Sequence, residues 1–180
     1  MNVALALPRT FAGGLLLLAL IVARPTSAQI SEAAVKATFL PKIARYVEWP
    51  SRAAGAPGAP LQLCIVGPDP FGRLMDEAAV GQSVGDRPVI VRRMGSSEPL
   101  GACQVAFLSG AAASRGLSAL RGRPVLTVTD SRDGPTRGIV HFALKSGRVS
   151  FHIDDVLARE AGLTISSRLL AIALTVRTRP

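Results

Sequence analysis

The apolar residues in the middle of the chain fall into short, nearly continuous runs separated by turn residues and helix-like segments. Such runs are typical of strands that are buried on both faces of a sheet. The predicted strands lie at 61–67, 88–94, 103–109 and 124–130, and the predicted helices at 69–80 and 114–122. Asp69 is placed to cap the first of these helices, and Pro70 to occupy its first turn. Strands alternating with helices predict a mixed, mainly parallel sheet with helices on both faces.

Between residues 138 and 154 the pattern changes to alternation of apolar and polar residues. A two-residue turn at Ser146-Gly147 would pair Lys145 with Arg148 and place every large apolar side chain of the segment on one face. A shift of one residue would destroy this separation, so the register is well specified. We therefore predict a β-hairpin in which His141 lies opposite His152. Serine is not the ideal first residue of such a turn, so the turn type stays open.

Helical spacing marks the beginning of the mature chain. We expect a helix from about residue 32 that is bent or restarted at Pro41, because proline removes a backbone donor, and that ends before Pro50. The predicted apolar stripe consists of Val35, Phe39, Ile43 and Val47.

The end of the chain also has helical spacing. Asp154 or Asp155 can cap a short helix that Gly162 terminates. Residues 164–178 then predict a second helix with one apolar stripe, more typical of core packing than of a docking surface. This stripe consists of Ile165, Leu169, Ile172, Ala173 and Val176.

The first 28 residues have the pattern of a secretory signal peptide: Arg9, an apolar run at 11–23, and the small residues Thr26 and Ala28. The run is short for a membrane span, although an uncleaved anchor is the alternative. No later segment is long and apolar enough to span a membrane. We expect a signal peptide at 1–28, one α/β domain at 29–180 and a periplasmic location.

Composition narrows the function. The 180 residues, 48% apolar and 18% charged, suit one globular domain with a sizeable core. The formal net charge is +9, but the arginines are scattered and form no basic run with interleaved aromatic residues. Nucleic-acid binding is therefore not expected, because it needs a clustered electrostatic footprint.

Cys64 and Cys103 are the only cysteines. An even count in an exported chain favours a disulfide over two separate buried thiols. The pair lacks the Cys-x-x-Cys spacing of thiol redox enzymes.

The polar residues offer no complete catalytic set. His141, His152 and Asp154 are a weak candidate zinc site, with a plain polar sheet face as the favoured alternative, because the chain has no third histidine. Asp130 and Asp133 follow a predicted parallel strand, where α/β enzymes place catalytic groups, but no nucleophile and base accompany them. We expect no enzyme and no cofactor.

Six stretches resemble, in order and spacing, the YfiR family of exported bacterial proteins. They are "EAAVKATFLPKIARYVEWP" (32–50), "LCIVGPDPFG" (63–72), "CQVAFLS" (103–109), "VLTVTD" (125–130), "VSFHID" (149–154) and "AGLTISSRLLAIA" (161–173). The resemblance implies a mixed α/β fold, a homodimer and a disulfide between Cys64 and Cys103. A second cysteine pair of some members has no counterpart here, and Pro41 departs from the family pattern.

The resemblance also implies a function: a periplasmic repressor that binds the sensor region of a YfiN-type membrane diguanylate cyclase and lowers cyclic di-GMP and biofilm formation. Release would involve either a YfiB-type outer-membrane lipoprotein that sequesters the repressor or a redox effect on its disulfides. Trp49, Pro50 and Arg168 are the candidate partner- or ligand-binding residues, although Trp49 is more readily a core anchor. The alternatives are a periplasmic small-molecule binder, with entry near the first helix and Trp49, and a zinc-dependent hydrolase using His141 and His152.

Overall fold

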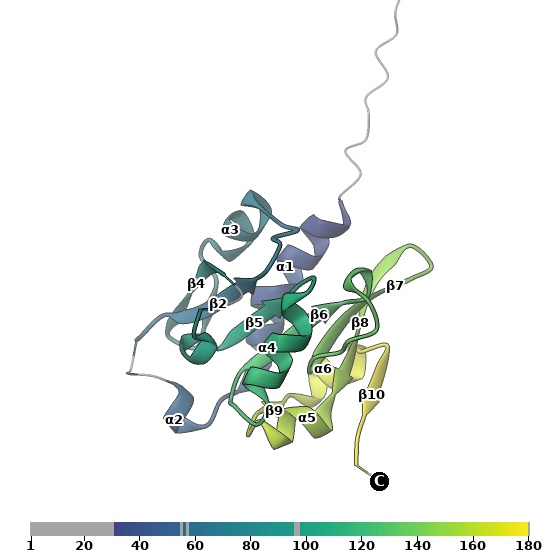
Figure 1. The fold of residues 1–180 in the computed structure, drawn as a ribbon. Coiled ribbons are helices and arrows are strands. Elements are labelled where there is room, and N and C mark those ends of the chain that lie inside the picture. Colours follow the sequence, from purple (N-terminus) through teal and green to yellow (C-terminus); the bar gives the residue numbers. More distant parts are fainter. Residues whose placement is uncertain (1–30, 55, 57, 96–97, 180) are drawn as a thin grey trace, which may run out of the picture.

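The computed structural model describes residues 31–54, 56, 58–95 and 98–179, so the predicted signal peptide lies outside the described residues. An eight-stranded sheet in the order β10-β8-β7-β6-β5-β2-β4-β3 forms the centre of the molecule (Figure 1). Its strands are β2 (Leu61–Val66), β3 (Ser83–Val84), β4 (Arg87–Met94), β5 (Val105–Leu108), β6 (Leu126–Asp130), β7 (Val140–Lys145), β8 (Arg148–Asp154) and β10 (Thr175–Arg177). A separate two-stranded ladder joins β1 (Val47–Glu48) to β9 (Thr164–Ile165).

Helices cover both faces of the sheet, as predicted. They are α1 (Glu32–Ala44), α2 (Ser51–Ala54), α3 (Arg73–Ala79), α4 (Ala112–Leu120), α5 (Asp155–Glu160) and α6 (Ser167–Ile172), with 3₁₀ turns η1 (Leu100–Ala102) and η2 (Ser131–Asp133). Alternate residues of the central strands face opposite layers. Leu63 and Ile65 belong to the core that includes α1 and α3, whereas Cys64 and Val66 face α4. Strands β4, β2, β5, β6 and β7 run parallel, which confirms the predicted fold class.

The β7–β8 hairpin has the predicted register, with His141 opposite His152 and Lys145 opposite Arg148. Ser146 and Gly147 both have positive φ angles, 50° and 74°. Two left-handed residues in succession define a type I′ turn, whose twist matches that of the flanking strands. The structure thus settles the turn type that the sequence left open.

Helix α1 begins at Glu32, capped by the Ser31 side chain, and continues through Pro41 to Ala44. The expected restart at Pro41 is wrong. The predicted stripe is right only in part: Ile43 and Val47 are buried, although Val47 lies in β1, whereas Val35 and Phe39 are only partly buried. The buried face consists of Lys36, Ala37, Leu40, Pro41, Ile43 and Ala44. The alanines are small and let the helix approach the sheet. A prediction based on large apolar residues alone therefore missed much of the buried face.

Two further helix predictions need correction. The single helix expected at 164–178 is three elements: β9, the short helix α6 and β10, which pairs parallel with β8. Strand pairing there overrides the helical spacing, and Ile172 of the predicted stripe is 69% exposed. Helix α3 begins at Arg73, not at Pro70. The Asp69 carboxylate instead accepts from the backbone N–H groups of Phe71 and Gly72 and stabilises the turn before the helix.

Candidate functional site

The disulfide joins two adjacent parallel strands. Cys64 lies in β2 and Cys103 lies two residues before β5, with their Cα atoms 5.9 Å apart. Both residues are buried in the core beneath α4. This bond closes a loop that contains α3, β3 and β4, and its burial is typical of a structural bond rather than a redox-active pair.

The two histidines lie on the half of the sheet face that α4 does not cover. The Gly138 N–H donates to Thr129 Oγ1 (2.9 Å), and the same hydroxyl lies 2.9 Å from His141 Nδ1. Thr129 thus links the His141 ring to the backbone at Gly138. Gly138 is needed here, because a Cβ would lie 2.8 Å from the Thr127 carbonyl oxygen.

His152 makes a separate contact, 2.6 Å from its Nδ1 to Thr175 Oγ1 of β10. The two imidazole centroids are 6.2 Å apart. Within the described part of the chain, no group of three or more His, Cys, Asp or Glu side chains could hold a metal ion. The structure places the two histidines opposite each other across the hairpin, as the register predicted.

We predict that both histidines titrate below the usual histidine pKa of 6.5. Burial lowers the pKa of His141, and the charges of Arg137 and His152 lower it further; burial and then Arg137 lower the pKa of His152. The unfolded chain therefore binds protons first, so stability is full above 6.5 and falls as the pH drops below it toward the folded-state values. NMR titration of the imidazole protons measures this directly. A pKa above 6.5 for either ring would contradict this prediction.

The segments that carry Trp49 and Arg168 meet through the β1–β9 ladder. Glu48 pairs with Thr164, and the Ser166 N–H donates to the Tyr46 carbonyl. Trp49 and Pro50 are half-buried, and Trp49 packs against the main core. Its Nε1–H has no hydrogen-bond partner among the described residues. The packing of Trp49 against the core agrees with its use as a core anchor, and its use as a contact residue stays a prediction.

Arg168 lies on the exposed side of α6, four residues before the exposed Ile172, so the two share one helix face. Tyr46, 41% exposed, stands beside the same ladder. We define the β1–α6 surface as Tyr46, Trp49, Pro50, Arg168 and Ile172. It contains two of the side-chain types that dominate protein–protein contacts, aromatic residues and arginine.

Sequence reasoning missed a buried ion cluster at the other end of α1. The Lys36 side chain is 3% exposed, and its ammonium lies 2.5 Å from the Asp130 carboxylate and also contacts Glu32. Arg132 donates to Glu32 through Nε (2.8 Å) and a second guanidinium nitrogen. The hydrogen bond from Arg132, with help from Lys36, lowers the pKa of Glu32 to about 2.

The strand β6 positions this cluster. Asp130 is its last residue, and its carboxylate also accepts from the Arg132 backbone N–H, which caps η2. A hollow of about 270 Å³ adjoins the cluster, lined partly by Pro70 and Phe71. The charges of two cations and two carboxylates balance in this cluster, which joins α1 to β6. The i,i+4 spacing of Glu32 and Lys36 was readable in the sequence, but the distant partner Asp130 was not.

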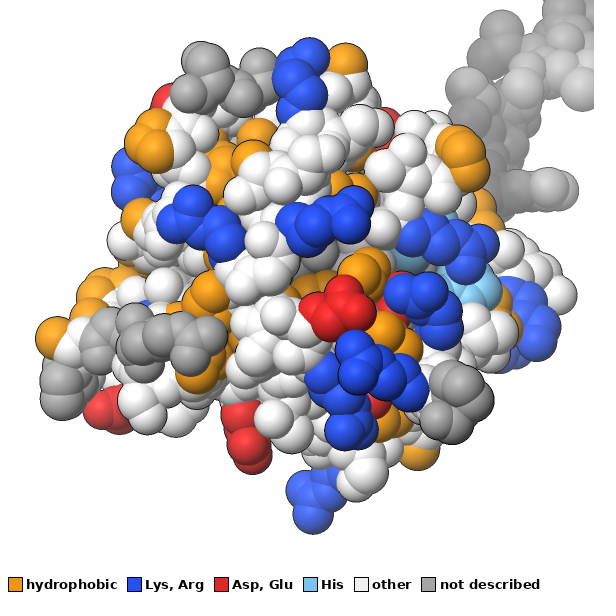
Figure 2. All heavy atoms as spheres, turned by 60° about the horizontal axis from the view of Figure 1, so that its bottom comes forward, with side chains coloured by type: hydrophobic (Ala, Val, Ile, Leu, Met, Phe, Trp, Pro, Cys, Tyr) orange, Lys and Arg blue, Asp and Glu red, His pale blue; other side chains and the backbone are white. Residues whose placement is uncertain are grey.

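The excess arginine does not form one uniform surface. Figure 2 shows basic side chains gathered around carboxylates on the face that includes α5 and β10. Three of the basic groups there are ion-paired: Arg159 with Asp155, Arg177 with Asp154, and Arg179 with Glu160. Much of the positive charge of this face is therefore committed to contacts within the fold.

Comparison with protein families gives one match. A family model described as YfiR/HmsC-like matches residues 33–174, which includes nearly all of the described fold. A comparison with curated proteins found no match.

Proposed function

This chain belongs to the YfiR/HmsC-like family, and we propose that it represses a membrane-bound diguanylate cyclase by binding the periplasmic sensor region of that enzyme. Family membership itself supports, at a coarser level, a periplasmic regulator of cyclic di-GMP signalling. The single observation that carries the proposal is the family match from the first helix to the end of α6. The buried disulfide agrees with it, because such bonds persist in oxidising compartments such as the periplasm.

Repression requires only that the regulator binds two conformations of the sensor region with different affinities. A regulator that binds the inactive sensor conformation more tightly shifts the cyclase population toward that state. The β1–α6 surface is the contact that we propose. Tyr46 and Ile172 offer exposed apolar area, and Arg168 offers an exposed charged donor.

The proposal includes several finer points. We propose export by a cleaved signal peptide at 1–28, a homodimer, sequestration by a YfiB-type outer-membrane lipoprotein, and no catalytic activity of the chain itself. No helix among the described residues is both long and apolar enough to cross a membrane.

The test combines a genetic and a binding measurement. Deleting the gene should raise cellular cyclic di-GMP, and expression of the protein from a plasmid should lower it again. In vitro, the purified protein should bind the periplasmic domain of the partner cyclase. The double substitution Arg168→Glu/Ile172→Asp should weaken binding by about tenfold or more, as expected for central contact residues.

The matched control is Arg115→Glu on α4, an equally exposed charge reversal outside the β1–α6 surface. It should leave the affinity unchanged. Unaltered cyclic di-GMP in the deletion strain, at verified expression of the cyclase, would count against repression. Equal losses of affinity in Arg115→Glu and in the double variant would count against the β1–α6 surface as the contact, but not against repression itself.

A further inference from the structure

One edge of the central sheet is open. Strand β4 pairs along its length with β2 on one side, but on the other side β3 covers only Arg87 and Pro88. Beyond them, the Val89 N–H donates to the Gln82 carbonyl. In a strand, the N–H and C=O of every second residue point to the same side. The backbone groups of Val91 and Arg93 therefore point away from the sheet, and no described residue pairs with them.

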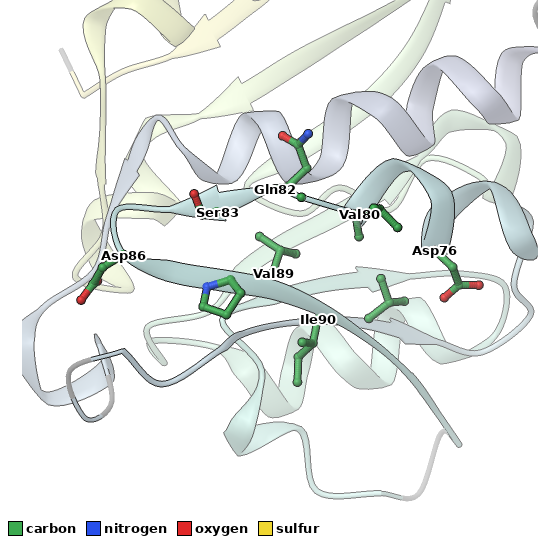
Figure 3. Close-up of a pocket in the computed structure, with 11 residues that line it drawn as sticks. Asp76, Val80, Gln82, Ser83, Asp86, Val89 and Ile90 are labelled. Carbon is green, nitrogen blue, oxygen red and sulfur yellow. The ribbon is translucent and has the colours of Figure 1, made fainter.

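A hollow of about 430 Å³ lies beside this open edge. Figure 3 shows it between the end of α3 and strands β3 and β4, with Val80, Val89 and Ile90 around it. Val80 is 76% exposed and Ile90 is 40% exposed, an unusual amount of apolar surface beside a free strand edge. Natural proteins normally protect such edges, because unpaired strand groups bind other strands.

We propose that this edge binds an extended segment of another polypeptide, which adds to the sheet as a strand next to β4. Its backbone pairs with Val91 and Arg93, as in other cases of strand addition. An apolar side chain of the segment fills the hollow beside Val80, on the α3 face of the sheet.

The charge of Arg92 indicates which type of residue fits the position next to the apolar one in the bound segment. Side chains of successive strand residues point to opposite faces, so the residue next to the apolar one lies beside Ile90 and Arg92. Arg92 is exposed, and its guanidinium bonds only the Gln62 side-chain oxygen, with no carboxylate partner among the described residues. Arg93, by contrast, is neutralised by Asp69 and Asp76. An acidic residue at the neighbouring position would pair with Arg92. The segment is therefore expected to alternate apolar and acidic residues.

A second copy of this chain does not fit the edge. Symmetric antiparallel pairing that uses the open groups can be centred on Val91, Arg92 or Arg93. Centring on Val91 would place the second β4 opposite residues 88–89, where Gln82 and β3 already lie. Centring on Arg92 would place two Arg92 residues directly opposite each other, and like charges in that position are destabilising. Centring on Arg93 would place Val91 of the second copy opposite residue 95, beyond the end of β4 at Met94.

The test uses a defined probe, the peptide acetyl-Thr-Val-Glu-Val-Thr-amide, and the full mature protein labelled with ¹⁵N. The two valines of the peptide share one face, and its glutamate lies on the other. We expect saturable NMR shifts at the Val91 and Arg93 amides at millimolar peptide, because so short a strand makes few contacts. The substitution Val91→Pro removes the outward donor, is compatible with an edge strand, and should abolish binding. Val91→Ala keeps the backbone donor and should retain most of the peptide binding.

Charge and backbone are tested separately. Arg92→Glu should weaken binding of the glutamate peptide and strengthen binding of the same peptide with lysine at its centre. A peptide methylated on its valine nitrogens should not bind, and this arm requires no variant of the protein. Absence of binding, or binding of the methylated peptide, overturns the proposal. Sedimentation of a dimer that Val91→Pro dissociates would also overturn it, since a second copy would then occupy the edge. None of these outcomes depends on the cyclase, so they are distinct from the test of the proposed function.

Discussion

Replacing Asp130 with asparagine is expected to destabilise the fold by about 3 kcal/mol or more. Asparagine keeps an oxygen that can accept the Arg132 backbone N–H, so the change removes mainly the negative charge. Lys36 then remains buried with only the partly exposed Glu32 as a counter-charge. Removing one partner of a buried ion pair typically costs about 3–5 kcal/mol, because the other charge stays desolvated without compensation.

Equilibrium unfolding in urea measures this loss, with circular dichroism to confirm an intact fold. Glu77→Gln, in the exposed pair of Arg73 and Glu77, is the matched control and should change stability by less than about 1 kcal/mol. The double variant Lys36→Met/Asp130→Asn should recover most of the loss, because no buried charge remains unpaired between the two positions. If Asp130→Asn behaves like Glu77→Gln, the pair is not desolvated as described.

Removing the disulfide by the double substitution Cys64→Ala/Cys103→Ala is expected to cost about 4 kcal/mol, within the range of 2–5 typical of small exported domains. The sequence separation of 39 positions sets this size, since the bond restricts a long loop of the unfolded chain. The loop contains the whole connection from β2 to β4 and back to β5. The variant should therefore also lose protection of β4 against hydrogen exchange before that of β6.

Urea unfolding of the oxidised protein, the reduced protein and the double variant tests this prediction. The reduced protein should match the variant to within about 1 kcal/mol, because both lack the same restriction on the unfolded chain. Reductant should have no effect on the variant itself. If the oxidised and reduced proteins are equally stable, the disulfide does not stabilise the protein by restricting its unfolded chain, and the prediction is wrong.

The sequence was most informative for those elements whose residue pattern fits only one structure. The strands β2, β4, β5 and β6 follow from apolar runs between turn residues, and the hairpin register follows because only one pairing separates apolar from polar side chains. The class of fold then follows from the alternation of strands with helices.

The failures arose where a distant partner decides the structure. Residues 164–178 have helical spacing, but pairing of β10 with β8 and of β9 with β1 divides them into three elements. Lys36 was not predicted to be buried, yet it faces the core, where it pairs with Asp130 of β6. The same contact rotates the buried face of α1 toward Ala37 and Ala44.

The β1–β9 ladder has a consequence for the order of folding. It joins Val47, near the beginning of the described fold, to Ile165, near its end. Contacts between residues so far apart are slow to form, since the intervening chain must first be closed into a loop. During synthesis from the N-terminus, α1 can pack against α3 early, because α3 follows it closely in the chain. Strand β1, in contrast, stays without its partner until β9 has been made, so this ladder is expected to close among the last contacts of the fold.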